Sequence, residues 1–426
     1  MLRRLVAGVC LGAAAIAAST SAYAQVTVTL SCSALGIEME LCRAGAERWA
    51  EATGNEVKLV STPADANERL SLYQTLLAAG SADIDIFQID VVWPGILAAH
   101  FIDLAPYLPH DERHRHLDVL VESNTVDGRL VAAPWFVDAG LLYYRADLLE
   151  DHGFEVPETW HELTATAETI VESERAAGNA RMQGFVFQGR AYEGLTTNAL
   201  EWIASFGGGT IVDADGRVTI DNPRAAEALG LARSWVGTIA PAGVLNYAEE
   251  EARGVFQSGN AVFMRNWPYA WALANAEDSP VRGQVGIAPL PRGAGEGAGH
   301  AATLGGQQLA VSRFSAHPEE AADLVAFLTG AEEQKRRAIE GAFNPTRPAL
   351  YEDTELLEAN PFLAGFADVL DGAVVRPSSV AGERYARVSN AVYNAVHATL
   401  AGSGSAEDNL AGLAHSLERI SRGGRW

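Results

Sequence analysis

The sequence is poor in basic residues and in cysteine, and each shortage excludes a class of function. Its 31 lysine and arginine residues are outnumbered by 54 aspartate and glutamate residues, which gives a formal net charge of -23. A surface this acidic repels nucleic acids and anionic membranes, so we expect neither as a partner. With 3 cysteines in the whole chain, a zinc site built from thiolates is not expected. We predict no metal and no cofactor.

Long apolar runs are also scarce. The run at residues 5–18 is shorter than the about 20 residues that cross a bilayer. It follows Arg3 and Arg4 and precedes the small-residue pattern of residues 21–24, which is typical of a cleavable signal peptide. We expect residues 1–24 to be removed by cleavage after Ala24, and the rest to be a soluble protein of the periplasm.

Two cysteines, Cys32 and Cys42, remain after that cleavage. In an oxidising compartment their separation by ten positions favours a disulfide, and two buried thiols are the alternative.

Motifs of catalysis and of metal binding are missing as well. The glycines at residues 207–209 are not followed by Lys-Ser/Thr, so a helix stop accounts for them better than a phosphate loop does. His110, His114 and His116 could form a metal site, but no carboxylate pattern completes it. We interpret them as the polar, solvated start of a helix, and we predict that the protein is not an enzyme.

What is present is an alternation of strands and helices. Patterning predicts strands at residues 26–30, 57–60 and 84–89, and helices at 40–53 and 67–79. Such an α/β alternation indicates a mostly parallel, doubly wound sheet. Ligands of such sheets sit beyond the carboxyl ends of the strands, which places Asp90 and the loop after Leu30 at the expected ligand edge.

The chain is expected to cross more than once between two α/β lobes. Pro134 forbids a regular central strand around it, and the candidate crossings are residues 135–138, 288–291 and 344–348. They divide the chain into an N-terminal lobe of residues 25–135 plus 291–345 and a C-terminal lobe of residues 136–290 plus 346–426. Two lobes with several crossings make a hinge over a cleft, which suits a ligand trap.

Residues 265–271, RNWPYAW, follow an apolar strand. Asn266 is expected to cap a helix whose first turn holds Pro268. The sharp turn would present Trp267 and Tyr269 as a ligand platform, although buried aromatic side chains usually serve core packing.

Several segments together resemble the periplasmic solute-binding proteins of ABC sugar importers, and among them the trehalose/maltose-binding group. They are DIDIFQIDVVWPG (83–95), DAGLLYYRADLLE (138–150), NPRAAEAL (222–229), FQSGNAVFMRNWPYAW (256–271), VGIAPLPRG (285–293) and AATLGGQQLAVS (301–312). The resemblance implies the two-lobed type II fold of the maltose-binding protein, with a hinge and an interlobe ligand cleft. It further implies a monomer that delivers a sugar to permease subunits in the inner membrane.

The resemblance also implies a set of substrate-binding residues. Carboxylates accept several hydroxyl hydrogens in fixed directions, and aromatic rings stack on the apolar face of a sugar. Glu40 is an alternative to Glu38, while Tyr192 and Glu193 match the pattern without a settled orientation. The implied residues are Glu38, Arg69, Asp90, Asp138, Trp267, Tyr269, Gly306, Gln307 and Arg376.

Two positions depart from the pattern of those relatives. Gln307 stands where they carry a tryptophan, and Phe136 where they carry a tyrosine. One sugar subsite has therefore changed. We expect a small α-glycoside, either a trehalose- or maltose-like disaccharide or a single ring with a polar aglycone such as glucosylglycerol.

Two other functions fit part of this pattern. In a secreted glycoside hydrolase, two of Glu38, Asp90 and Asp138 would flank the scissile bond, one of them with a raised pKa. In a sugar sensor, the same fold would report to a membrane receptor instead of a permease.

Overall fold

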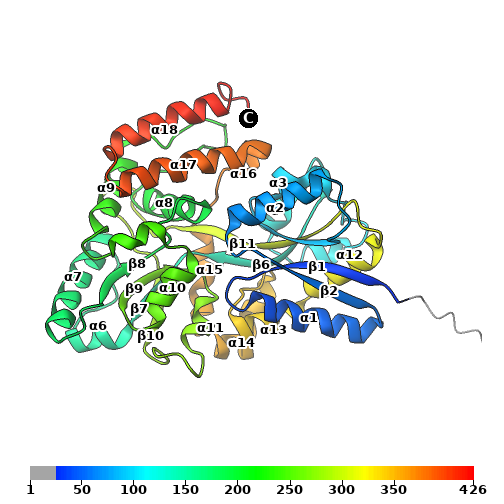
Figure 1. Cartoon of the computed structure of the whole chain (residues 1–426), viewed down its shortest axis with the longest axis horizontal. Coiled ribbons are helices and arrows are strands. Elements are labelled where there is room, and N and C mark those ends of the chain that lie inside the picture. The colour runs from blue at the N-terminus through cyan, green and yellow to red at the C-terminus, as the bar shows by residue number, and fades with distance from the viewer. Residues whose placement is uncertain (1–24) are drawn as a thin grey trace, which may run out of the picture.

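The computed structural model describes residues 25–426. The predicted signal peptide and its cleavage site lie outside these residues. Figure 1 shows the described chain as two groups of strands, each covered by helices. Among the described residues, no helix combines the length and the apolar character needed to cross a membrane.

The first sheet has the strand order β12-β11-β3-β1-β2, and β6 pairs with β11 beside this path. β1 lies parallel to β2 and β3, whereas β11 lies antiparallel to both β3 and β6. A short separate hairpin joins β4 (Thr125–Val126) to β5 (Arg129–Leu130). The strands of the first sheet are β1 (Thr27–Ser33), β2 (Glu56–Thr62), β3 (Ile86–Asp90), β6 (Ala133–Ala139), β11 (Ala302–Val311) and β12 (Ala373–Val374).

The second sheet has the order β10-β7-β9-β8. β7 lies antiparallel to β9 and to β10, and β8 lies parallel to β9. Its strands are β7 (Leu141–Arg145), β8 (Gln183–Val186), β9 (Ala261–Asn266) and β10 (Val285–Pro289).

Both sheets are therefore mixed. The strands from which a parallel sheet was predicted keep that arrangement, since β2 and β3 both lie parallel to β1, whereas β11 and most of the second sheet depart from it. A crossover helix forces parallel pairing only where it returns the chain to a neighbouring strand of the same sheet. β11 instead arrives from β10 of the second sheet, so it is free to pair antiparallel.

The chain passes directly from the first sheet to the second at Gly140, between β6 and β7. A Cβ atom at this position would lie 2.1 Å from Glu201 Oε1, so the passage requires glycine. Pro134 lies in β6, where the ladder with β11 shifts its register, as expected of a proline in a strand. The residue boundaries of the two lobes stay a prediction.

Helices surround both sheets. Thr159 caps α7 through a capping box with Glu162, and Asn222 caps α9. The left-handed Gly54 ends α1 after Thr53, where the sequence predicts the end of that helix. The helices are α1 (Glu38–Thr53), α2 (Ala66–Ala78), α3 (Pro94–Leu97), α4 (His110–Arg113), α5 (Asp118–Ser123), α6 (Ala146–His152), α7 (Trp160–Ala176), α8 (Glu193–Ser205), α9 (Pro223–Trp235), α10 (Glu249–Gln257), α11 (Ala270–Ala274), α12 (Pro318–Leu328), α13 (Ala331–Gly341), α14 (Thr354–Ala359), α15 (Phe366–Asp371), α16 (Ser378–Ala381), α17 (Tyr385–Leu400) and α18 (Ala406–Ile420).

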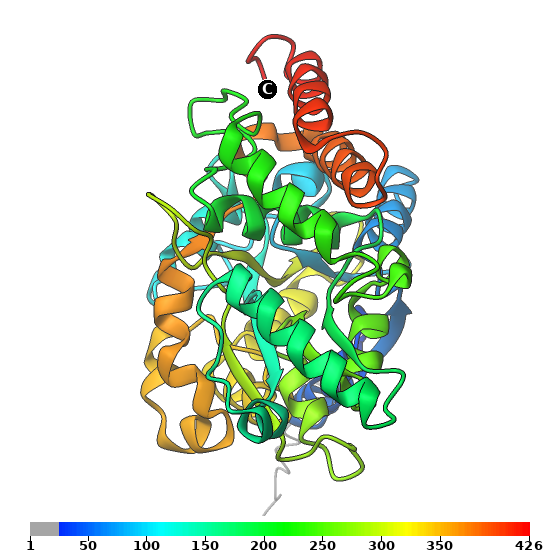
Figure 2. The same cartoon turned by 90° about the vertical axis from the view of Figure 1, so that its left-hand side faces the viewer.

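The C-terminal helices complete the second group. α17 and α18 lie side by side over α8 and α9, and Figure 2 shows the same arrangement from the side. Beneath them, the side chains of Trp160, Phe185, Trp202 and Trp235 form a buried aromatic cluster on β8. This core fixes α8, whose first turn faces the site described below.

The turn after β9 differs from its prediction. Asn266 is the last residue of β9, and α11 begins at Ala270 after Tyr269, so Asn266 does not cap a helix and Pro268 precedes the first turn. Asn266 Oδ1 instead accepts from the backbone N–H of Trp267 at 2.8 Å, and its Nδ2 donates to the carbonyl of Glu249 at 3.2 Å. Asn266 thus links the turn after β9 to Glu249, the first residue of α10.

The three histidines do not act together. His110 and His114 are exposed neighbours on one helical turn, whereas His116 is buried and hydrogen-bonded to Thr346 Oγ1 at 2.7 Å. Burial lowers the pKa of His116 to about 3, and the charge of Arg347 adds to this shift. The prediction of a solvated helix start is therefore correct for His110 and His114 and wrong for His116, which is buried. Within residues 25–426, no group of histidine, cysteine and acidic side chains is arranged to hold a metal ion.

Candidate functional site

A cavity of about 60 Å³ lies between the two sheets and is lined by residues from both sides. This volume is below the roughly 300–1,000 Å³ typical of small-molecule sites, so the two sides lie close together around the cavity. The walls bring together segments that are far apart in the sequence, from α1 to the loop after β12. All nine residues named from the resemblance line this cavity: Glu38, Arg69, Asp90, Asp138, Trp267, Tyr269, Gly306, Gln307 and Arg376.

The disulfide between Cys32 and Cys42 joins the end of β1 to the first turns of α1, as predicted. The Cα atoms of the two cysteines are 6.5 Å apart. This bond fixes the start of α1, where Glu38 is the first helical residue.

Glu38 and Arg69 form one wall on the side of the first sheet. Gln88 Nε2 donates to Glu38 Oε2 at 2.7 Å. Burial raises the pKa of Glu38, and the positive charge of Arg69 opposes that shift. Arg69 Nη1 donates to the carbonyl of Pro63 at 3.1 Å, which holds the guanidinium at the wall. Glu40, the alternative to Glu38, is exposed and does not line the cavity.

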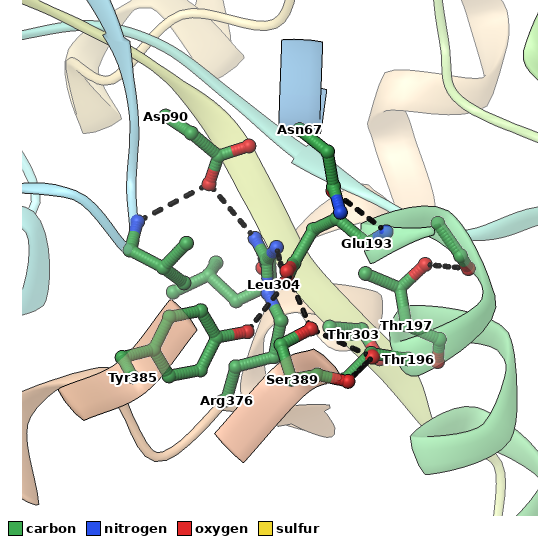
Figure 3. Close-up of polar contacts among 12 residues, drawn as sticks. Asn67, Asp90, Glu193, Thr196, Thr197, Thr303, Leu304, Arg376, Tyr385 and Ser389 are labelled. Atoms are coloured by element: carbon green, nitrogen blue, oxygen red, sulfur yellow. Dashed lines mark hydrogen bonds and ion pairs between the residues drawn. The ribbon is translucent and has the colours of Figure 1, made fainter. Parts of the chain in front are cut away.

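Arg376 links two carboxylates at the edge of the cavity, as Figure 3 shows. Its Nη2 donates to Asp90 Oδ1 at 3.1 Å, and its Nη1 donates to Glu193 Oε1 at 2.8 Å. Glu193 accepts further hydrogen bonds from Ser389 Oγ at 2.6 Å and from the hydroxyl of Tyr385. The network connects β3 to α8 and α17, and the one positive charge of Arg376 is shared by two carboxylates.

Asp138, near the end of β6, is the least satisfied group of the wall. It is 9% exposed, and within residues 25–426 its Oδ1 has no hydrogen-bond partner. Burial raises the pKa of Asp138 well above its usual value, the negative charge of Glu38 adds to the shift, and Arg265 opposes it. A buried acceptor without a donor is costly, so the wall offers a strong position for a ligand hydroxyl.

Trp267 supplies the aromatic surface. The guanidinium carbon of Arg265 lies 3.9 Å from the centroid of the indole ring, and Trp267 Nε1 donates to Glu249 Oε1 at 3.4 Å. On β11, a Cβ atom at Gly305 would lie 2.9 Å from the ring, so glycine makes room for it. The half-buried ring is thus held in place by its neighbours while it lines the cavity.

Tyr269 also lines the cavity but is more deeply packed, with 3% of its surface exposed. Its hydroxyl donates to Glu250 Oε1 at 2.6 Å, and its ring packs against Gly36. Burial raises the pKa of Tyr269 well above its usual value. The ring of Tyr269 therefore belongs more to the packed core, and the ring of Trp267 is more exposed to the cavity.

Gly306 and Gln307 form the β11 part of the wall. Gly306 has a φ of 116°, and a Cβ atom there would lie 2.3 Å from the carbonyl oxygen of Phe136. Glycine is therefore needed for the close approach of β11 to β6, independent of any ligand. Gln307 Oε1 accepts from Arg69 Nη2 at 3.4 Å, so its amide takes part in the polar wall.

Some wall residues were not identified from the sequence. Glu249, the first residue of α10, accepts from the hydroxyl of Tyr192 at 2.7 Å as well as from Trp267. It is one of three consecutive glutamates, and nothing in the pattern distinguishes it from Glu250. Tyr192 and Glu193, whose orientation the sequence left open, both line the cavity.

Arg337 is a second residue that the sequence did not indicate. Its guanidinium carbon lies 3.9 Å from the ring centroid of Trp135 and 4.8 Å from that of Phe343, which lines the cavity. It has no hydrogen-bond partner among the described residues, and burial lowers its pKa to about 10. Its positive charge opposes the upward pKa shifts of Glu38 and Asp138.

Comparison with known proteins gives a consistent picture. The model of the family described as bacterial extracellular solute-binding protein matches residues 38–335. A probable ABC transporter-binding protein of Deinococcus radiodurans is 49% identical over 97% of each chain. The structure of maltose-bound MalE3 of T. maritima has a TM-score of 0.87 at 41% identity and covers 93% of this chain and 100% of that chain. The GacH receptor of Streptomyces glaucescens, at 22% identity, shares the fold with a TM-score of 0.81 over 93% of this chain and 99% of that chain.

Proposed function

The chain belongs to the bacterial extracellular solute-binding proteins, and on that premise we propose that it captures a small α-glycoside between its two sheets. The family makes it the substrate-binding component of an ABC sugar transporter. We propose that it works in the periplasm as a monomer, hands the sugar to the permease and performs no catalysis.

One observation carries the proposal. A single cavity joins an aromatic face, Trp267, to acceptor groups and donors that come from both sheets. Asp138 Oδ1, which has no partner among residues 25–426, can accept from a sugar hydroxyl, and the Trp267 ring offers a flat apolar surface for a pyranose. A sugar that touches both sheets binds the closed arrangement better than an open one, and this difference in affinity drives closure.

The choice of an α-glycoside rests on two findings. The T. maritima relative at 41% identity was solved with maltose bound. In this chain, however, Gln307 provides an amide where the resemblance leads us to expect a second stacking surface. We therefore propose either a two-ring glucoside held at one ring mainly by hydrogen bonds, or a single glucosyl ring with a polar aglycone.

The proposal is tested by thermal unfolding of the purified protein against trehalose, maltose, sucrose, glucosylglycerol, glucose and polyols. A ligand that binds only the native state raises the midpoint, and the stabilisation grows with the logarithm of ligand concentration above the dissociation constant, so at least one α-glucoside should give a shift that grows with concentration. If no glucoside shifts the midpoint, the proposed ligand class is wrong. If free monosaccharide accumulates from a disaccharide during incubation, the protein is a hydrolase and the proposal fails.

Replacement of Gln307 by tryptophan should shift the preference toward two-ring sugars. The indole would restore a stacking surface beside Gly306 and remove the amide that accepts from Arg69. An aromatic–sugar contact is worth about 1 kcal/mol, so we expect the ratio of disaccharide to single-ring affinity to rise about fivefold in calorimetric titrations. Gln307→Leu is the matched control because it removes the amide without adding a ring. If the two variants give the same ratio, our account of this subsite is wrong.

A further inference from the structure

Residues 64–67, which lead into α2 and form its first turn, connect the two sides of the cavity. Ala64 and Ala66 line the cavity, whereas the residues that alternate with them, Asp65 and Asn67, bond to residues on the side of the second sheet. α2 itself rests on the first sheet, where the hydroxyl of Tyr73 lies 2.9 Å from Ser31 Oγ. Any separation of the two sides must therefore break the bonds of Asp65 and Asn67.

Asn67 caps α8 from across this boundary. Its Oδ1 accepts from the backbone N–H of Glu193 at 3.1 Å, as Figure 3 shows. Glu193 is the first residue of α8, and Tyr192, the residue at the N-cap position, makes no capping hydrogen bond with its side chain. Asn67 Nδ2 donates in turn to the hydroxyl of Tyr393 on α17, at 3.1 Å. One side chain of α2 thus holds two helices of the other side.

Asp65 forms an ion pair with Arg190 next to this cap. Asp65 also caps its own helix by accepting from the backbone N–H of Glu68 at 2.9 Å. The guanidinium carbon of Arg190 lies 4.7 Å from the ring centroid of Tyr192, a cavity residue. The Arg190 side chain is 37% exposed, so salt should screen this ion pair.

We infer that Asn67 and the Asp65–Arg190 pair are affinity-determining residues that act without touching the sugar, by holding the two sides of the cavity closed. This inference rests on the proposed function. Bonds that exist only while the cavity is closed slow the release of a trapped ligand, so their loss appears mainly as a faster dissociation rate. Asp65 and Asn67 thereby set the residence time, while the residues of the wall select the ligand.

The test measures association and dissociation rates by stopped-flow fluorescence with the best sugar of the thermal panel. Loss of a helix cap costs about 1 kcal/mol, so Asn67→Ala should dissociate about fivefold faster with an unchanged association rate. Asn67→Asp retains an acceptor for the N–H of Glu193 and should recover most of the lost residence time. Arg190→Ala should dissociate about threefold faster at low salt, and high salt should abolish that difference.

Two substitutions serve as controls. Within the described part of the chain, exposed Asn394 on α17 bonds only to its own helix, and exposed Arg217 pairs only with Asp213 and Asp215. Asn394→Ala and Arg217→Ala should therefore leave both rates unchanged. An unchanged dissociation rate in Asn67→Ala, or a loss of affinity entirely through slower association, would overturn the inference.

A readout without sugar separates this inference from the proposed function. Hydrogen exchange of a peptide that contains Glu193 should be faster in Asn67→Ala than in the wild-type protein, because the amide loses its acceptor. If no sugar binds but exchange is faster, the proposed ligand class fails and the cap across the boundary stands. If exchange at Glu193 is the same in both proteins, without sugar and also with the best sugar of the thermal panel, the cap is not formed in solution and the inference fails.

Discussion

Trp267→Ala is expected to remove most of the affinity for sugar and to leave the fold intact. Among the aromatic side chains that line the cavity, the indole of Trp267 is the one that is not fully buried. The guanidinium carbon of Arg265, 3.9 Å from its ring centroid, and the hydrogen bond to Glu249 hold it in position. Truncation removes the stacking surface and leaves water in its place. A side chain of this size contributes about 3 kcal/mol when it is covered, so the dissociation constant should rise about 100-fold in calorimetric titrations.

Trp271→Ala is the matched control for this prediction. Trp271 is half-buried on α11, four residues along the chain, and packs against Phe362 at a centroid distance of 6.0 Å without lining the cavity. Its loss should lower the midpoint of unfolding without changing the affinity. If Trp267→Ala instead binds sugar as tightly as the wild-type protein and unfolds at a much lower midpoint temperature, Trp267 is a core-packing residue and not a binding residue.

Asp138→Asn is expected to stabilise the ligand-free protein at neutral pH while it weakens sugar binding. Asp138 is buried with one oxygen unpartnered among the described residues, and burial together with the charge of Glu38 raises its pKa. A carboxyl whose pKa is raised on folding favours the unfolded state above the unfolded pKa of about 3.9. The penalty grows as the pH rises from about 4 through the raised pKa, and it is constant above it.

The amide of asparagine does not ionise, so the variant avoids this penalty. We expect its midpoint of unfolding to exceed that of the wild-type protein by about 3 °C at pH 8, and the difference to vanish near pH 4. The affinity should fall about tenfold, because a charge-assisted hydrogen bond to the sugar becomes a neutral one. Asp278→Asn, at an exposed position, is the control and should change neither quantity. A variant that is less stable at pH 8 would show that the Asp138 carboxylate has a stabilising role that its geometry does not reveal.

The local elements of the fold could be predicted because their signals are local. The capping residues Thr159 and Asn222 and the terminating Gly54 mark helix ends through bonds to their own helices. The direction of β11 could not be predicted in this way. It depends on which sheet the preceding strand occupies, and that is decided by contacts between residues far apart in the sequence.

The same distinction between local signals and long-range contacts explains which features of the site could be predicted from the sequence. The residues of the wall were named from a resemblance, and the structure collects all nine in one cavity, where their role in binding remains our proposal. Their mutual bonds were not predictable. Arg376 joins Asp90 to Glu193, and Asn67 caps a helix 126 positions away. No periodicity or spacing encodes such pairs, since each partner alone looks like an ordinary polar residue at the end of an element.

The central claim, that the cavity between the two sheets binds an α-glycoside, is tested most directly by isothermal titration calorimetry. Wild-type protein and Trp267→Ala would be titrated side by side with maltose, trehalose and glucosylglycerol. We predict that at least one of these binds the wild-type protein with one ligand per chain and binds the variant about 100-fold more weakly. Binding of equal strength to both proteins, or no binding of any of the three to the wild-type protein, would contradict the claim.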